Sequence, residues 1–351
     1  MAQGRICPSL YRGSSLLHLL IMPALLCSGD KVDVYVLMGQ SNMLGEGKIG
    51  PDNVNGSLGY AVKTEHKYPY LWNHSSNTWA VREDVRYVEV IGSGNSSFEH
   101  SNLAHNEFMT VTGKTIGPEL GIGNYVGNAT KNRVMILKAC IGNRALGWDL
   151  LPPGSPGWEY KDKKNVTWEY AGYHQSPAKW QKGTTPKPIG WMAGEQYDGD
   201  TNRTEYILSN LTYFFPGATS YDIAGFFWWQ GDRDSRDIGL ATRYEINLVK
   251  LIKTLRAQFK APNAKFVTAS LGQTVNGSTD GGGVILDAML NVANPAKYPE
   301  FKGNVAAVYT HPLSMGGSSG AHYNGNAETY MNVGQAMGEA MVELMKADNA
   351  M

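Results

Sequence analysis

The chain has 351 residues, of which 42% are hydrophobic and 18% are charged, a composition typical of a globular protein with a sizeable core. Lysine plus arginine and aspartate plus glutamate both number 31, so the formal net charge is zero. Because there is neither a basic stripe nor an acidic tail, this balance argues against a nucleic-acid partner and against a solvating role.

The first 29 residues have the order of a secretory signal peptide. Arg5 and Arg12 precede the apolar run SLLHLLIMPALLC at 15–27, and the small residues Ser28-Gly29 follow it. The run is too short to span a bilayer as a stable helix. We therefore expect cleavage after Gly29, a secreted or periplasmic product and no stable membrane insertion afterwards. A wrongly assigned start and an apolar N-terminal arm stay open as alternatives.

Five apolar runs rich in β-branched and aromatic residues predict buried strands. They cover residues 33–38, 133–140, 222–229, 265–272 and 304–310. Strands alternating with helices predict an α/β fold, a three-layer α/β/α sandwich around a mostly parallel five-stranded sheet. We expect a single domain over residues 30–351.

Two amphipathic patterns predict long helices at 241–259 and 327–347. The first places these residues on one broad face: Tyr244, Ile246, Leu248, Leu251, Ile252 and Leu255. The second does the same with Met331, Val333, Met337, Met341 and Leu344. We expect both faces to pack against the sheet.

Two long segments, 48–113 and 148–205, are rich in Gly, Pro, Asn, Trp and Tyr and have no sustained period. Both leave the carboxyl end of a predicted strand, the edge at which open α/β sheets bind ligands. We predict that they are loop insertions forming the walls of a substrate cleft.

Cys140 is the only cysteine that would remain after signal removal, and we expect it to be a small buried apolar residue. With no second sulfur ligand and no histidine spacing signal, we expect neither a metal site nor a cofactor. Eight Asn-x-Ser/Thr sequons matter only in a host that glycosylates exported proteins: Asn55, Asn73, Asn95, Asn128, Asn165, Asn202, Asn210 and Asn276.

Polar residues and glycines gather where the predicted strands end. Strand 33–38 runs into Gly39-Gln40-Ser41-Asn42, strand 133–140 into Ile141-Gly142-Asn143, and strand 222–229 into Gln230-Gly231-Asp232. His322 stands shortly before the final helix. A serine nucleophile needs a base and donors for the oxyanion that forms. Ser41, His322, the backbone N–H groups of Ser41 and Gly142, and the Gln230 amide offer that set.

GQSNM at 39–43, Gly142 after the next strand, WWQGD at 228–232 and the histidine before the last helix resemble the SGNH hydrolase superfamily. More narrowly, they are similar to the sialate O-acetylesterase-like carbohydrate esterases, and Ile116-Gly117-Pro118-Glu119 is similar to a Gly-Pro-Glu segment of that group. The resemblance covers nearly all of the chain from about residue 31.

The resemblance implies a serine esterase that removes O-acetyl or other small acyl groups from carbohydrates. It makes Ser41 the nucleophile, His322 the base, and Ser41, Gly142 and Gln230 the oxyanion donors. Gln40, Asn42 and Glu119 lie in the matching motifs and are further candidates for binding the oxyanion or the substrate. An acylated carbohydrate is the expected partner.

Three positions depart from the family pattern. Its Gly-Gly turn is Gly142-Asn143 here, its Gln-Gly-Glu ends in Asp232, and Ser319 stands where an aspartate is expected three residues before His322. A triad acid orients and stabilises the imidazole, so its loss can cost orders of magnitude in rate. Another carboxylate substitutes, or the enzyme is a Ser-His dyad, or the protein is inactive.

Several residues compete for the open roles. Asp232 is our preferred substitute acid, with Asp234 and Glu328 as alternatives. His311 is the alternative base, although a structural role suits it better, and His74 and His174 are candidates for substrate contact. Two other functions stay open: a secreted carbohydrate-binding protein that has lost activity, and a lipolytic hydrolase of the same superfamily. The sugar, the acyl group and the oligomeric state are not set by the sequence.

Overall fold

The computed structural model describes residues 30–348. The expected signal peptide, residues 1–29, lies outside the described residues, so export stays a prediction. None of the helices within 30–348 is both long and apolar enough to cross a membrane.

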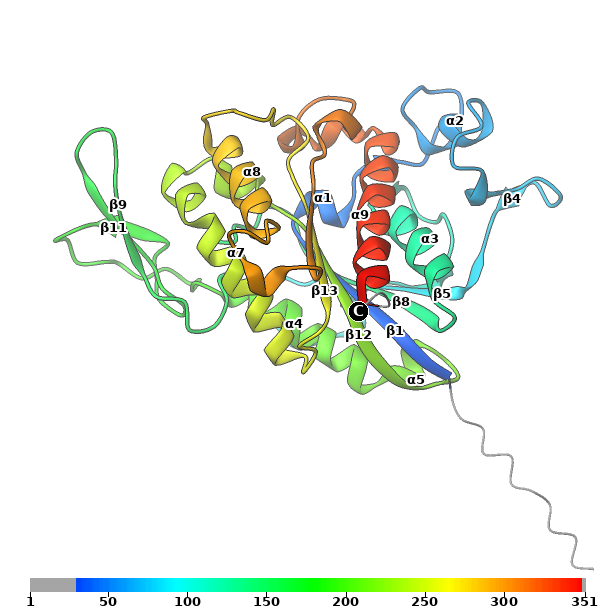
Figure 1. The fold of residues 1–351 in the computed structure, drawn as a ribbon, viewed down its shortest axis with the longest axis horizontal. Helices are drawn as coiled ribbons and strands as arrows, with labels where there is room; N and C mark the ends of the chain where they lie inside the picture. Colours follow the sequence, from blue (N-terminus) through cyan, green and yellow to red (C-terminus); the bar gives the residue numbers. More distant parts are fainter. Residues whose placement is uncertain (1–29, 349–351) are drawn as a thin grey trace, which may run out of the picture.

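A seven-stranded sheet forms the centre of the fold, in the order β14-β13-β12-β1-β8-β5-β6 (Figure 1). Neighbouring strands run parallel except for β5 and β6, which are antiparallel. The strands are β1 (Asp30–Gly39), β5 (Arg82–Val90), β6 (Leu103–Met109), β8 (Arg133–Ala139), β12 (Ala218–Trp229), β13 (Lys265–Ala269) and β14 (Val305–Val308).

The five predicted strands are confirmed as β1, β8, β12, β13 and β14, but the predicted number of strands is wrong. β5 and β6 arise inside the 48–113 segment that we predicted to be loop. Charged residues interrupt the apolar pattern of β5, and one of them, Glu89, is buried because it is paired with Lys138. Apolar periodicity does not detect a strand that buries a paired charge.

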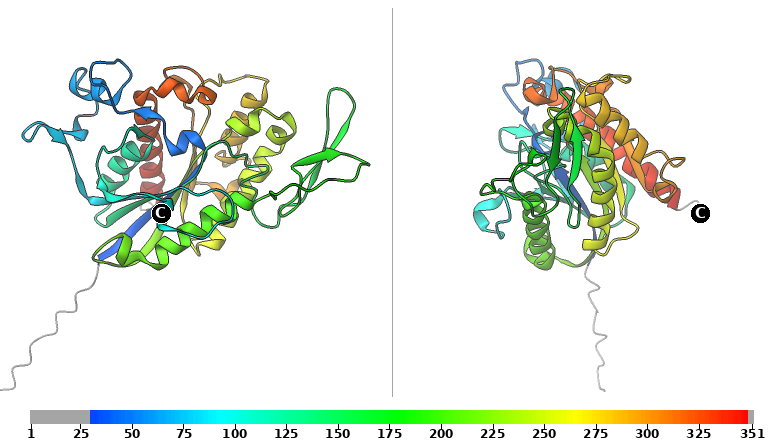
Figure 2. Two further views of the ribbon diagram at one scale, coloured as in Figure 1. Left: turned by 180° about the vertical axis from the view of Figure 1, so that it is seen from behind. Right: turned by 90° about the vertical axis from the view of Figure 1, so that its left-hand side faces the viewer.

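Helices cover both faces of the sheet, which confirms the three-layer α/β/α architecture (Figure 2). Side chains of β1 alternate between the layers: Val34 and Val36 enter one core, and Tyr35 and Leu37 the other. The first core also contains residues of α4 (Glu195–Ser209), α5 (Leu211–Phe214), α7 (Ile238–Gln258) and α8 (Gly281–Val292). The second contains residues of α2 (Leu58–Lys63), α3 (Glu119–Ala129) and α9 (Ala327–Asp348).

The two long predicted helices are confirmed as α7 and α9. All five apolar residues predicted for the inner face of α9 are buried. On α7 the prediction is wrong for one residue. Ile246 is 51% exposed, because its position in the helical repeat points away from the buried Tyr244 and Leu248.

The two long segments hold more structure than predicted. Residues 158–181 form a three-stranded antiparallel sheet that projects from the body at the left of Figure 1, and the 48–113 segment adds a small hairpin at the right. The projecting strands are β9 (Trp158–Lys161), β10 (Thr167–Tyr170) and β11 (Lys179–Gln181), and the hairpin is β3 (Trp72–Asn73) with β4 (Thr78–Trp79). A short antiparallel pair, β2 (Gly47–Lys48) and β7 (Thr115–Ile116), flanks the hairpin in sequence.

The direction in which the sheet is built reverses at β1. From β1 the chain first forms β5, β6 and β8 on one side, and then β12, β13 and β14 on the other. Connections therefore diverge at the carboxyl ends of β1, β8 and β12, and such a switch point is where open α/β sheets bind ligands.

Candidate active site

Ser41 lies at this switch point, immediately after β1. Gly39 approaches β12 so closely that a Cβ there would lie 2.3 Å from the Trp229 carbonyl oxygen, and its φ of 151° suits glycine. Ser41 then opens the short helix α1 (Ser41–Leu44) and is 7% exposed. Its N–H belongs to the first turn of a helix, where no intrahelical acceptor exists.

Gly142 faces Ser41 from the end of β8. A Cβ built on Gly142 would lie 3.5 Å from the Ser41 Cβ, an ordinary contact distance. Among the described residues, no hydrogen bond uses the N–H of Gly142. Asn143, with φ of 57°, turns the chain away directly afterwards. The structure therefore brings together the predicted nucleophile and one of its predicted oxyanion donors.

Gln230 lies at the end of β12 with its amide hydrogen-bonded, and its oxyanion role stays a prediction. Its amide nitrogen donates to the Arg144 carbonyl at 2.8 Å, to Asp234 Oδ2 at 2.6 Å and to Gln40 Oε1 at 3.1 Å. Its amide oxygen accepts from Tyr244 at 2.9 Å. The Gln230 amide therefore ties strand ends together, and to bind an oxyanion it would have to exchange one of these partners.

Gln40 shares this positioning role. Its Oε1 also accepts from the backbone N–H of Arg233 at 3.2 Å, in α6 (Asp232–Ser235). Asn42 is fully buried, and neither polar atom of its amide has a hydrogen-bond partner within residues 30–348. An unpaired buried amide beside a candidate nucleophile is costly and therefore uncommon.

Asp234 is a buried carboxylate that accepts several hydrogen bonds, and it does not suit the role of substitute triad acid. It accepts from the backbone N–H groups of Leu146 and Gly147, both at 2.9 Å, and from Gln230. Burial raises the pKa of Asp234 to about 6, although these donors act in the opposite direction. Its oxygens hold the turn that follows Gly142, so they are not available to an imidazole.

His322 lies in an unusual turn, η5 (Ser319–Gly325), which packs beside α1. His322, Tyr323 and Asn324 all have φ between 51° and 53°, in the left-handed region that costs non-glycine residues free energy. Tyr323 anchors the turn, because its hydroxyl accepts from the Gly272 N–H at 3.1 Å and its ring stacks on Trp229. The structure contains no hydrogen bond between His322 and Ser41.

Asp232 lies against the position at which the family pattern expects an acid. Ser319 donates its hydroxyl to Asp232 Oδ1 at 3.0 Å, and a Cβ on Gly320 would lie 3.2 Å from the same oxygen. Arg236 binds the other carboxylate oxygen. Asp232 is itself buried. The η5 sequence lacks a carboxylate at this position. Asp232, at the start of α6 just after β12, places its carboxylate against η5 instead.

The other predicted alternatives have partners elsewhere. Glu328 is buried and ion-paired with Lys67, and His311 lies 2.8 Å from the Gly272 carbonyl through its Nδ1. His74 is in the turn of the β3–β4 hairpin, whereas His174 stacks on Tyr173 and pairs with Asp198. No group of three or more His, Cys, Asp or Glu within 30–348 could hold a metal ion.

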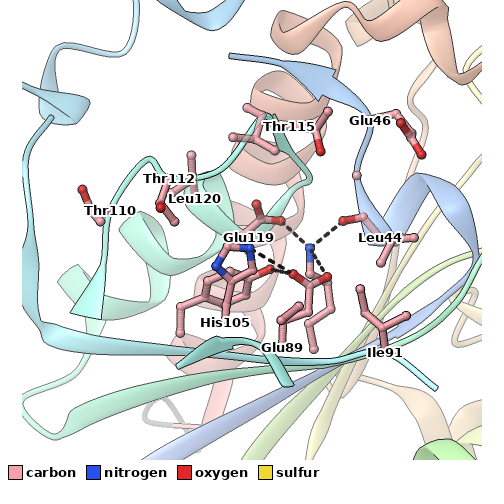
Figure 3. Close-up of a pocket in the computed structure, with 15 residues that line it drawn as sticks. Leu44, Glu46, Glu89, Ile91, His105, Thr110, Thr112, Thr115, Glu119 and Leu120 are labelled. Carbon is pink, nitrogen blue, oxygen red and sulfur yellow. Dashed lines mark hydrogen bonds and ion pairs between the residues drawn. The ribbon is translucent and has the colours of Figure 1, made fainter. Parts of the chain in front are cut away.

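Glu119 belongs to a buried ionic cluster that the sequence analysis missed (Figure 3). Lys138, 1% exposed on β8, lies 2.9 Å from Glu119 and 3.3 Å from Glu89, and donates to the Leu44 carbonyl at 2.7 Å. Glu119 also accepts from the Gly117 N–H at 2.9 Å. The cluster lines a cavity of about 230 Å³ and fixes the end of α1, so Glu119 positions the nucleophile turn instead of binding its oxyanion.

A sequence signal for this cluster was present. Lys138 is the only charged residue in the apolar stretch VMILKAC, and a lysine there requires buried carboxylates. The carboxylates overcome the effect of burial, so the pKa of Lys138 lies above its ordinary value and the amine stays charged. Cys140 is buried as predicted, and burial raises the pKa of its thiol.

Comparisons with known proteins place this chain near the carbohydrate esterases. Residues 175–343 match the family model described as carbohydrate esterase, sialic acid-specific acetylesterase. The probable carbohydrate esterase At4g34215 of Arabidopsis thaliana is 24% identical over 246 residues, which cover 68% of this chain and 68% of that protein.

One solved structure supports the fold. XAC1771, a carbohydrate acetylesterase from Xanthomonas citri, is 15% identical and has a TM-score of 0.51, with 90% of this chain and 56% of that chain covered. The structure of the Arabidopsis protein is 17% identical, with a TM-score of 0.47 and coverage of 89% and 98%. The predicted family resemblance and α/β fold are confirmed, and the matches support carbohydrate esterase activity.

Proposed function

We propose that this chain, as a relative of the sialic acid-specific carbohydrate esterases, is a serine esterase that removes acetyl or other small acyl groups from carbohydrate hydroxyls. The observation that carries the proposal is the pairing of Ser41 with Gly142 across two strand ends. A hydroxyl at the start of α1 faces a glycine turn, and neither N–H group has an acceptor within residues 30–348. This arrangement suits a tetrahedral oxyanion.

In the first half of the reaction, Ser41 Oγ attacks the carbonyl carbon of the ester and His322 takes the hydroxyl proton. The carbonyl π electrons move to oxygen, and the N–H groups of Ser41 and Gly142 stabilise that oxyanion. When the tetrahedral species collapses, the bond to the sugar oxygen breaks and His322 returns the proton to it. The sugar leaves with a free hydroxyl, and the acyl group remains on Ser41.

In the second half, a water molecule gives a proton to His322, and the water oxygen attacks the acyl carbon. The new oxyanion collapses, the bond to Ser41 Oγ breaks, and Ser41 recovers its proton from His322 while the carboxylic acid leaves. Asp232 stabilises the transient imidazolium. Support for this role is its hydrogen bond to Ser319, which places the buried carboxylate, also paired with Arg236, against the turn carrying His322.

The inactive binding protein is the less well supported alternative. Its main argument was Ser319 in the acid position, and Asp232 weakens that argument because a carboxylate contacts Ser319. A lipolytic activity has no positive support, because both cavities near the strand ends mix charged and polar side chains with apolar ones and neither is a purely apolar channel.

The proposal is tested by measuring acetate released from a panel of O-acetylated sugars. Ser41→Ala and His322→Ala should each abolish turnover on any substrate that the wild-type protein cleaves. Ser75→Ala, in the remote β3–β4 hairpin, is the matched control for Ser41→Ala and should keep full activity. Turnover that survives in Ser41→Ala would refute the mechanism.

A further inference from the structure

A hollow of about 410 Å³ is lined by Trp191, whose ring packs against the Arg144 guanidinium. Its lining includes Asn95, His174, Trp191, Met192, Glu195 and Asp198. The volume lies within the range of pockets that bind small ligands. None of these residues has a part in the chemistry proposed above.

Arg144 connects the hollow to the reaction centre. It follows Gly142 by two residues, and its guanidinium lies over the Trp191 ring at 5.0 Å from the centroid. The same guanidinium donates to Ser93 Oγ at 2.9 Å and to Gln196 Oε1 at 3.2 Å. The Trp191 and Arg144 side chains therefore connect the hollow to the Gly142 turn.

Trp191 carries an unused donor. Its indole Nε1 is buried and has no hydrogen-bond partner within residues 30–348, although the residue lines the hollow. Buried donors of this kind normally have an acceptor, and a ligand hydroxyl would provide one. Gly94, with φ of 64°, leaves room for the Trp191 ring, because a Cβ on Gly94 would lie 3.2 Å from Trp191 Cζ3.

The remaining polar groups are acceptors held in fixed positions. Asp198 binds the Tyr173 hydroxyl at 2.6 Å and His174 Nε2 at 3.0 Å, and Glu195 accepts from the Met192 N–H at 2.9 Å. Carboxylate oxygens can accept further bonds beyond these. His174 stacks on Tyr173 and its side chain is still 52% exposed, so one ring face is open to a ligand.

We infer that the hollow is a subsite for a second, uncharged sugar ring of the acylated carbohydrate. Aromatic faces pack against the C–H faces of a pyranose, while the carboxylates and the indole N–H bind its hydroxyls. Asp198 and Glu195 would repel a sugar carboxylate, so the ring in this subsite is neutral. The inference rests on the proposed function and deepens it: the substrate is an oligosaccharide or polysaccharide.

The test is isothermal titration calorimetry with the Ser41→Ala variant, so that binding is measured without turnover. The ligands are O-acetylated xylotriose and mannotriose, their acetylated methyl monosaccharides, and acetylated sialyllactose as the acidic comparison. Protein is produced in a host without N-glycosylation, because Asn95 is a sequon in the hollow. At least one neutral trisaccharide should bind roughly tenfold more tightly than its monosaccharide.

Adding Trp191→Ala should remove that roughly tenfold advantage, and Trp72→Ala, in the remote hairpin, should keep it. If Trp191→Ala does not fold, Trp191→Phe and Asp198→Asn replace it, and each should weaken trisaccharide binding several-fold. Equal affinity for trisaccharide and monosaccharide, an advantage that survives in the variants, or binding of the acidic ligand alone would overturn the inference. If Ser41→Ala binds the trisaccharide but the wild-type protein releases no acetate from any substrate, the esterase proposal is refuted and the subsite is retained.

Discussion

Replacing Lys138 by methionine should destabilise the protein strongly, because it would leave Glu119 and Glu89 buried without their cation. Removing one partner of a buried ion pair costs about 3–5 kcal/mol. The substitution also removes the hydrogen bond from Lys138 to the Leu44 carbonyl, which contributes about 1 kcal/mol. A loss of about 4–6 kcal/mol is a large share of the roughly 5–15 kcal/mol by which domains are stable.

Urea denaturation followed by tryptophan fluorescence measures this loss as a change in the free energy of unfolding. Lys131→Met, an exposed lysine shortly before β8, is the matched control and should stay within about 0.5 kcal/mol of wild type. Adding Glu119→Gln to Lys138→Met should recover part of the loss, because one of the two stranded charges disappears. A cost below about 1 kcal/mol for Lys138→Met would refute the reasoning that the cluster holds α1 in place.

Three further outcomes are expected. Asp232→Asn should lower turnover roughly 10²–10⁴-fold and shift the acidic limb of the pH–rate profile, whereas a Ser-His dyad would change by only a few fold. Ser319→Asp alone should be harmful, because two carboxylates would meet, but combined with Asp232→Asn it should restore activity; failure of this rescue would argue against Asp232 as the acid. Asp234→Asn should flatten the pH dependence of stability between about pH 4 and 6. The folded pKa of about 6 lies above the ordinary 3.8, so the folded state holds a proton that the unfolded state has lost. Wild-type stability therefore falls as pH rises through this window, by about 3 kcal/mol for this group, and equal slopes in denaturation series of both proteins would contradict the assignment.

The parts of the fold that the sequence predicted are those governed by apolar pattern. Runs such as VYVLM and FFWW are buried on both faces, and the Met-rich stripe of α9 follows the helical period. β5 escaped detection because it contains Arg86 and Glu89, whose burial depends on partners distant in sequence. Apolar periodicity does not contain this information, since a charge can be buried when tertiary structure neutralises it.

In the candidate site, too, residue positions set by the strands could be predicted, whereas side-chain hydrogen bonds could not. The positions of Ser41 and Gly142 follow from strand ends in a parallel sheet, so the sequence could predict that they meet. The hydrogen bonds of the Gln230 amide to Asp234 and the Arg144 carbonyl could not be predicted, because side-chain hydrogen bonds depend on the packed geometry. Asp232 was the preferred substitute acid from the sequence, but its hydrogen bond to Ser319, 87 positions away in the chain, could not be predicted.

The central claim is that Ser41 is an activated nucleophile, and covalent labelling tests it most directly. Wild-type protein is treated with a fluorophosphonate and its mass is measured, followed by peptide mapping. We predict a single adduct on Ser41 that is absent in Ser41→Ala, is strongly slowed in His322→Ala and forms normally in Ser75→Ala. An unlabelled folded protein, or an adduct that persists in Ser41→Ala, would contradict the claim.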